Sequence, residues 1–172
     1  MELAALGVTL TLNFLARGRI AFVSDAYRVA ATPPPFTFGI WAVIYGLWAA
    51  TLQSPADPYF VRSLISSNVW LWAWCFERLG MSFAALVAYA VFTARVRRKG
   101  GVRDWARSVT LSWTVAAAAL NALSWASLDR TGCWGAVVLL AMDGLRAAIV
   151  NDWPYVAARA WALNGCIVAL TH

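Results

Sequence analysis

Seven apolar runs follow one another along the chain, and short polar or proline-containing connections separate them. We expect helices over residues 3–16, 36–53, 61–76, 81–96, 105–125, 133–150 and 153–171. The first run is short against the roughly 20 residues that a helix needs to cross a bilayer. It continues to Phe22 if the long side chains of Arg17 and Arg19 reach the membrane interface. The pattern predicts an all-α fold, a polytopic transmembrane helix bundle.

The stretch Thr32–Trp48, TPPPFTFGIWAVIYGLW, organises the rest of the chain. Its three consecutive prolines each fix their own φ and lack an N–H, so they lie outside a helix and the next helix begins at their end. In that helix Trp41, Tyr45 and Trp48 recur at i, i+4 and i+7 and share one face. Lipid alone does not require such a face. We therefore expect it to pack against partner helices or to form one wall of a pocket for a flat, apolar ligand.

The composition excludes an ordinary soluble domain. Of the 172 residues, 62% are hydrophobic and 13% are charged, whereas a typical soluble domain is about 25% charged. The length predicts a single transmembrane domain, residues 1–172. We expect an integral, multi-pass membrane protein; a bacterial inner or outer membrane and an organellar membrane of a plastid or mitochondrion all stay open.

The net charge of +6 is concentrated in one place. Six cations lie in or beside a single short connection between apolar runs: Arg95, Arg97, Arg98, Lys99, Arg103 and Arg107. This clustering is typical of a cytoplasmic loop, and it places the connection and the N-terminus on the cytoplasmic or equivalent side of the membrane. Membrane lipids with anionic headgroups are the expected partners of these cations, and nucleic acid is not.

The residue inventory does not favour catalysis. The single histidine is His172, so a histidine-based triad and a multi-histidine metal site are not expected, and we expect this side chain to be solvated and inert. We find no paired carboxylates and no glycine-rich phosphate loop. Cys75, Cys133 and Cys166 form no C-x-x-C motif and are expected to be buried thiols. We expect neither an enzyme nor a metal site, and no required cofactor.

Asparagine side chains lie inside several apolar runs, at Asn13, Asn68, Asn121 and Asn164. An unpaired amide in hydrocarbon is costly, so each is expected to find a partner on another helix or a ligand. Hydrogen bonding between helices is the simpler interpretation, and we favour it for Asn13 and Asn164. For Asn68 and Asn121 both interpretations stay open.

Large rings are the candidate walls of a cavity: Trp41, Tyr45, Trp48, Trp70, Trp74, Trp113 and Trp125. Aromatic faces stack on a flat ligand and add about 0.5–1.5 kcal/mol per contact beyond area burial. Trp70 and Trp74 share a helical face because they are four residues apart, and Trp72 points away. The alternative for each ring is helix packing or the interfacial belt, and the belt is expected near predicted helix ends, at Trp48, Trp105, Trp134 and Trp153.

Four segments follow one another in a specific order. They are TP-x-x-F-x-F-x-IW-x-x-IY from Thr32, NVWLWAW at Asn68–Trp74, ERLGMSFAAL at Glu77–Leu86 and SWTVAAAALNAL at Ser112–Leu123. Together they resemble the TspO/translocator protein family of tryptophan-rich sensory proteins and peripheral benzodiazepine receptor-like proteins. The resemblance implies a TspO-like five-helix core, residues 1–127. Residues 128–172 would be a C-terminal extension of one or two helices, as in the longer bacterial branch.

The resemblance also implies a function. It suggests a binding or regulatory receptor whose aromatic-lined cavity holds a tetrapyrrole (porphyrin) or a similar flat apolar ligand such as a sterol. A bound porphyrin, pigment or lipid would be a ligand and not a required cofactor. The implied ligand-binding residues are Phe36, Trp41, Tyr45, Asn68, Trp70, Trp74, Trp113, Asn121 and Trp125. Phe36 stands where porphyrin-binding members have a tryptophan after the proline pair, which removes one ring on which light-driven porphyrin degradation would rely.

Two other functions stay open. Short loops and small size also suit a non-catalytic accessory subunit of a photosynthetic or respiratory membrane complex, making protein, lipid or pigment contacts; a homodimer is a further arrangement. A transporter of small apolar molecules would rely on Asp143 and Arg146, which are three residues apart and can pair on one helix face. For this pair we favour a position near the membrane interface, where the sixth helix would end.

Overall fold

The described residues form seven α-helices. The structure, a computed structural model, describes residues 1–52, 57–127 and 129–171. These segments contain no strand; they contain a short 3-10 helix, η1 (Pro35–Gly39), and the helices α1 (Glu2–Ala26), α2 (Ile40–Ala49), α3 (Pro58–Cys75), α4 (Leu79–Arg95), α5 (Gly101–Ala126), α6 (Arg130–Ile149) and α7 (Trp153–Thr171). The predicted all-α bundle is confirmed, and both C-terminal apolar runs are helical. His172, and with it the role expected for its side chain, lies outside the described residues.

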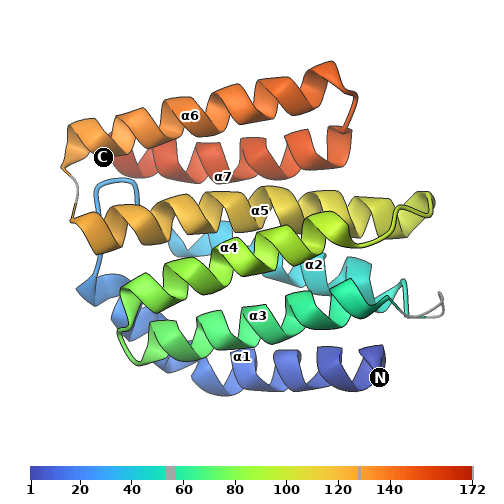
Figure 1. Cartoon of the computed structure of the whole chain (residues 1–172). Coiled ribbons are helices and arrows are strands. Elements are labelled where there is room, and N and C mark those ends of the chain that lie inside the picture. Colours follow the sequence, from blue (N-terminus) through green and yellow to red (C-terminus); the bar gives the residue numbers. More distant parts are fainter. Residues whose placement is uncertain (53–56, 128, 172) are drawn as a thin grey trace.

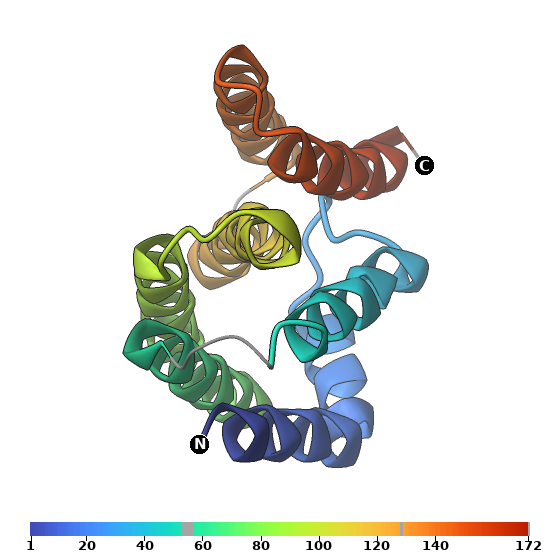
Figure 2. The same ribbon diagram turned by 90° about the vertical axis from the view of Figure 1, so that its right-hand side faces the viewer.

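Helix α5 occupies the middle of the bundle, as the view in Figure 2 shows. It packs against α4, α7 and α2, whereas α1 packs on α3 and α6 packs mainly on α7. The N-terminus and the connection 96–100, called here the basic connection, lie at the same end of the bundle, on the right in Figure 1. The connection 27–34, called here the proline connection, lies at the opposite end. The N-terminus and the basic connection therefore lie on one side, as the charge distribution predicts.

Three of the described helices, α1, α5 and α6, are long and apolar enough to cross a membrane, which indicates a membrane protein. The first helix was expected to end at residue 16 or to continue to Phe22. The shorter extent is wrong, because α1 runs unbroken for 25 residues. Arg17 and Arg19 do not interrupt it, since both lie at exposed positions. The Arg17 guanidinium lies 4.0 Å from the centroid of the Phe14 ring, and Arg19 pairs with Glu77 at 2.5 Å.

The three prolines shape the start of the next helix as their chemistry requires. Pro34 is extended, with φ −62° and ψ 156°, and Pro35 is the first residue of η1, where its missing N–H breaks no hydrogen bond. The chain passes from η1 directly into α2, which ends at Ala49. The predicted helix end at Gln53 and the start of the predicted SPADP break lie outside the described residues. Pro58 is the first residue of α3, and the Asp57 side chain caps that helix.

The proline segment rests on α7, the last helix. A Cβ atom at Gly165 would lie 2.7 Å from Cγ2 of Thr37 and 2.9 Å from Cβ of Pro33, so only glycine fits there without movement. Trp161 donates its indole N–H to the carbonyl of Thr37 at 2.8 Å, and its ring meets Phe36 edge-on at 5.9 Å. The C-terminal pair of helices therefore helps to position the segment that leads into α2.

Polar contacts fasten both ends of α1. At the N-terminal end Glu2 and Arg103 form a buried ion pair at 3.5 Å, and the Glu2 carboxylate also accepts the backbone N–H of Asp57 at 2.6 Å. Just beyond the other end Tyr27 donates a hydrogen bond to Glu77 at 3.0 Å, which raises the pKa of Tyr27 above its ordinary value of 10.0. Helix α1 is thereby anchored to α5, to the start of α3 and to the turn between α3 and α4.

Candidate functional site

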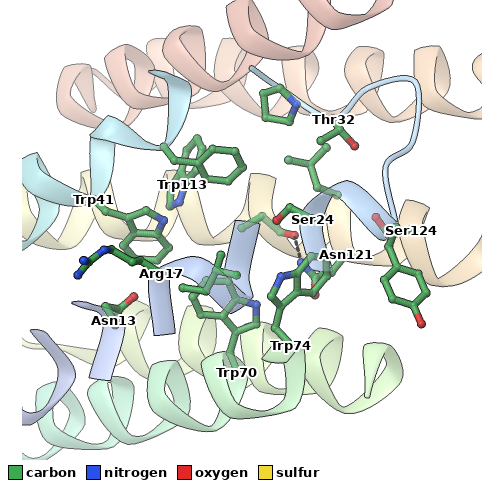
Figure 3. Close-up of a pocket in the computed structure, with 16 residues that line it drawn as sticks. Asn13, Arg17, Ser24, Thr32, Trp41, Trp70, Trp74, Trp113, Asn121 and Ser124 are labelled. Atoms are coloured by element: carbon green, nitrogen blue, oxygen red, sulfur yellow. Dashed lines mark hydrogen bonds between the residues drawn. The ribbon is translucent and has the colours of Figure 1, made fainter. Parts of the chain in front are cut away.

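A hollow of about 230 Å³ lies inside the bundle between α1, α3 and α5, and the proline connection and α2 close it. Figure 3 shows Trp41 and Trp113 on one side of it, with Trp70 and Trp74 below. We call this space the inner cavity. Its lining residues are Asn13, Arg17, Ile20 and Ser24 of α1; Tyr27, Thr32 and Pro33; Phe38 of η1; Trp41 of α2; Trp70 and Trp74 of α3; and Trp113, Ala117, Leu120, Asn121 and Ser124 of α5.

Trp41 is the centre of the aromatic wall. Its ring stacks on Trp70, with centroids 5.6 Å apart and 21° between the planes, and on Tyr45, at 5.7 Å and 23°. Trp113 meets Trp41 edge-on at 6.3 Å, and Phe38 meets Trp113 edge-on at 5.9 Å. Stacked and edge-to-face pairs are the arrangements that aromatic quadrupoles favour. The rings therefore hold one another in fixed orientations around the inner cavity.

Amide side chains contribute polar groups to the same wall. Asn121 accepts the Ser82 hydroxyl at 2.5 Å and donates to the carbonyl of Ala117 at 3.1 Å, so it joins α4 to α5 while it lines the cavity. Asn13 donates to the carbonyl of Thr9 within α1 at 2.8 Å, not to another helix as predicted. Both amides therefore lie at the cavity wall with their orientation set by hydrogen bonds.

Two indole N–H groups at the cavity wall are buried without an acceptor. The Nε1 atoms of Trp70 and Trp113 are shielded from solvent and have no hydrogen-bond partner among the residues that the structure describes. Trp113 is 1% exposed and Trp70 is 8% exposed. A buried, unsatisfied donor costs about 1–3 kcal/mol. A bound molecule with acceptor atoms at these two positions would recover part of that cost.

Five of the nine residues predicted for ligand binding line the inner cavity: Trp41, Trp70, Trp74, Trp113 and Asn121. The other four do not. Tyr45 lies one turn beyond Trp41 and stacks on the Trp41 ring. Asn68 precedes Trp70 by two residues, which turns it to a different side of α3. Phe36 is turned outward against Trp161, away from the cavity.

Trp125 is the fourth predicted residue that lies outside the inner cavity. It is 59% exposed and lies beside Phe83, over Gly80, where an added Cβ would come within 3.2 Å of the Trp125 ring. The small residue at position 80 lets this ring lean out over α4, although Trp125 follows Asn121 by one turn of α5. Trp48 lies neither at the inner cavity nor in an exposed belt: it packs between helices in the core, and its indole N–H donates to Thr110 at 2.8 Å.

The first helix carries cavity residues that the sequence reasoning missed. Asn13, Arg17, Ile20 and Ser24 follow one another at intervals of four, three and four residues, so they form one stripe along α1. Polar residues at helical spacing in an otherwise apolar run were the available signal. Phe38 was also missed. It lies in η1, whereas the aromatic face predicted from spacing belongs to the helix that carries Trp41 and Tyr45.

The charged residues of the C-terminal helices pair between helices and not within one. Asp143 forms an ion pair with Arg159 of α7 at 2.7 Å, and Tyr155 donates to the same carboxylate at 2.6 Å. Arg159 is fully buried, whereas Arg146 lies at an exposed position. The predicted Asp143–Arg146 pair is therefore wrong. The partner could not be identified from spacing along one helix, because it comes from the next one.

The arrangement is that of a helical membrane-type protein with an internal, ring-lined cavity in which a few polar groups are fixed in position. Within the described residues no group of three His, Cys, Asp or Glu side chains could hold a metal ion. Comparisons with protein-family models, curated proteins and solved structures gave no match to this chain.

Proposed function

We propose that this chain is a multi-pass membrane protein that binds a flat, apolar ligand with hydrogen-bond acceptors, such as a porphyrin, in the inner cavity. One observation carries the proposal: Trp41, Trp70 and Trp113 line the cavity, and Trp70 and Trp113 hold a buried N–H that has no partner within residues 1–52, 57–127 and 129–171. Aromatic faces suit a planar ring system. The unpaired donors suit a ligand that brings pyrrole nitrogens, carbonyls or carboxylates.

The volume of the cavity limits how such a ligand binds. At about 230 Å³ it is smaller than the pockets of about 300–1,000 Å³ that hold drug-sized molecules. A small planar ligand fits the cavity as it stands, whereas a tetrapyrrole requires the proline connection to move outward. Pro33 and Phe38 line the cavity on that side, and the neighbouring Thr37 is held by α7.

The similarity to the TspO/translocator family supports the same proposal. Trp41, Trp70, Trp74 and Trp113 lie in the segments that carry the similarity, and all four line one cavity. Asn121, in the last of those segments, lines it as well. The proposal is one of binding and regulation without catalysis, with any bound porphyrin or other pigment as ligand and not as required cofactor.

Titration of the purified protein with protoporphyrin, followed by tryptophan fluorescence, tests the proposal. We expect saturable quenching, and we expect Trp41→Ala and Trp113→Ala each to weaken binding by at least tenfold. That factor corresponds to about 1.4 kcal/mol, within the range for losing a ring that packs directly on a ligand. Trp72→Ala is the matched control, because Trp72 lies on the opposite, exposed side of α3.

Quenching that does not saturate would contradict the proposal. Equal loss of affinity in Trp72→Ala and Trp113→Ala would also contradict it, because it would show that porphyrin binds to the outer, lipid-facing rings.

A further inference from the structure

Two arginines of α1 differ in whether they have a carboxylate partner. Arg19 pairs with Glu77 at 2.5 Å. Arg17, two residues earlier, pairs with no carboxylate of the described residues. Its Nη1 atom donates to the Phe14 carbonyl at 3.2 Å, and its guanidinium lies 4.0 Å from the centroid of the Phe14 ring. The charge of Arg19 is therefore compensated within the chain, and the charge of Arg17 is not compensated by any residue that the structure describes.

Arg17 lies well inside α1, a helix that is long and apolar enough to cross a membrane. The nearer end of α1 is at Ala26, about 14 Å away at 1.5 Å per residue. The hydrogen bond to Phe14 directs the guanidinium back along the helix, away from that end, so the side chain does not reach toward the nearer interface. A cation within a spanning helix is costly without a partner and is by default a candidate for function.

The place of Arg17 is at the edge of the inner cavity. It is exposed on α1 and is also one of the residues that line the cavity. Figure 3 shows it on the side of Trp41 and Asn13, whereas Thr32 and Ser124 lie toward the opposite end. A planar ligand that packs beside Trp41 would therefore have one edge near Arg17.

The wall of the inner cavity carries positive charge. Arg17 is the only charged residue among the lining residues that the structure describes, and no Asp or Glu is among them. The buried indole N–H groups of Trp70 and Trp113, which also belong to this wall, have no acceptor within the described ranges. One cation and two free donors favour a ligand that brings acceptor atoms and negative charge. A neutral ligand such as a sterol would leave the cation unpaired.

We propose that Arg17 binds a carboxylate of the ligand, so that the inner cavity selects planar aromatic carboxylates over neutral planar molecules. The inference rests on the function proposed above and names the ligand class: a porphyrin with free propionates belongs to it, and a sterol does not. A guanidinium holds a carboxylate through two parallel N–H···O bonds, which are roughly twice as strong as bonds between neutral groups. The bond to Phe14 uses Nη1, so the N–H groups at Nε and Nη2 are left for the carboxylate.

Protoporphyrin and its dimethyl ester test this assignment, because they share one ring system and differ in charge. Both are titrated into the full chain in an uncharged detergent at neutral pH, and binding is followed by tryptophan fluorescence. We expect the diacid to bind at least about tenfold more tightly than the ester. Arg17→Gln should weaken binding of the diacid by about tenfold and leave binding of the ester unchanged. Arg62→Gln is the matched control, since Arg62 is also exposed and lies over an aromatic ring, that of Tyr59, but does not line the cavity.

Equal affinity for diacid and ester in the unmodified protein would overturn the inference, as would a preference for the diacid that survives Arg17→Gln. Equal loss of both ligands in Arg17→Gln would also overturn it, because it would show that Arg17 acts on the fold and not on the carboxylate. Saturable quenching by both ligands with equal affinity, lost in Trp113→Ala, would leave the proposed function intact and overturn only this inference. Absence of saturable quenching by either ligand would contradict both.

Discussion

The inner cavity and the α6–α7 pair both place polar groups away from solvent, but they treat them differently. In the α6–α7 pair the Asp143 carboxylate is shared by Arg159 and Tyr155, which lie on the facing helix. At the cavity the N–H groups of Trp70 and Trp113 face no acceptor among the described residues. The first arrangement holds two helices together. The second leaves two indole donors unsatisfied, and among the described residues the Nε and Nη1 atoms of Arg159 are unsatisfied as well.

Hydrogen-bond satisfaction also differs between residues of one type. The N–H of Trp48 is satisfied by Thr110, whereas the N–H of Trp113 has no partner in the part of the chain that the structure describes. Both side chains are 1% exposed. The proposed ligand would offset part of the cost of the unsatisfied donor at the cavity.

The largest expected effect is on stability and comes from breaking the polar network between α6 and α7. Arg159→Met leaves the Asp143 carboxylate without its cation and should lower the free energy of unfolding by about 3 kcal/mol, at the lower end of the range for breaking a buried pair, because the carboxylate is partly exposed. Arg146→Met, one helix away at an exposed position, should change it little. Chemical denaturation in detergent micelles measures both.

The double variant Asp143→Leu/Arg159→Met sharpens that test. It removes both charges and should recover most of the stability lost in Arg159→Met alone, because no unpaired charge is left between α6 and α7. Porphyrin affinity should stay unchanged in all three variants. Loss of affinity in the double variant would show that the α6–α7 network and the inner cavity are not independent.

The second prediction concerns the contact between Gly165 of α7 and the proline segment, which connects the α6–α7 pair to the inner cavity. Gly165→Ala puts a Cβ within 2.6 Å of Oγ1 of Thr37 and should cost about 1–3 kcal/mol, the usual cost of overpacking. It should also weaken porphyrin binding, since Pro33, which lines the cavity, is among the atoms displaced. Gly135→Ala on α6 has open space around its new Cβ and is the matched control. Unfolding and titration of the same samples compare the two; equal stability of the two variants would contradict the contact.

The sequence predicted the helices well because each apolar run is bounded by prolines, glycines or charged residues. It also predicted the part of the cavity wall that depends on spacing along one helix, as for Trp70 and Trp74. It failed where a side chain's direction depends on a neighbouring helix. Gly80 on α4 leaves space for the Trp125 ring, and Asp143 pairs with Arg159 of α7 and not with Arg146 of its own helix. Residue spacing within one apolar run predicts neither contact.

The smallest expected effect tests the unpaired donor itself. Trp113→Phe keeps an aromatic ring at the cavity wall and removes the N–H, so it should weaken porphyrin binding by about 2- to 12-fold, the equivalent of one hydrogen bond of about 0.5–1.5 kcal/mol. Trp48→Phe makes the same substitution where the N–H is bonded to Thr110. It should lower the free energy of unfolding by about 0.5–1.5 kcal/mol and leave affinity unchanged. If both variants lose affinity equally, the indole N–H of Trp113 does not contact the ligand, and the cavity recognises its ligand by shape alone.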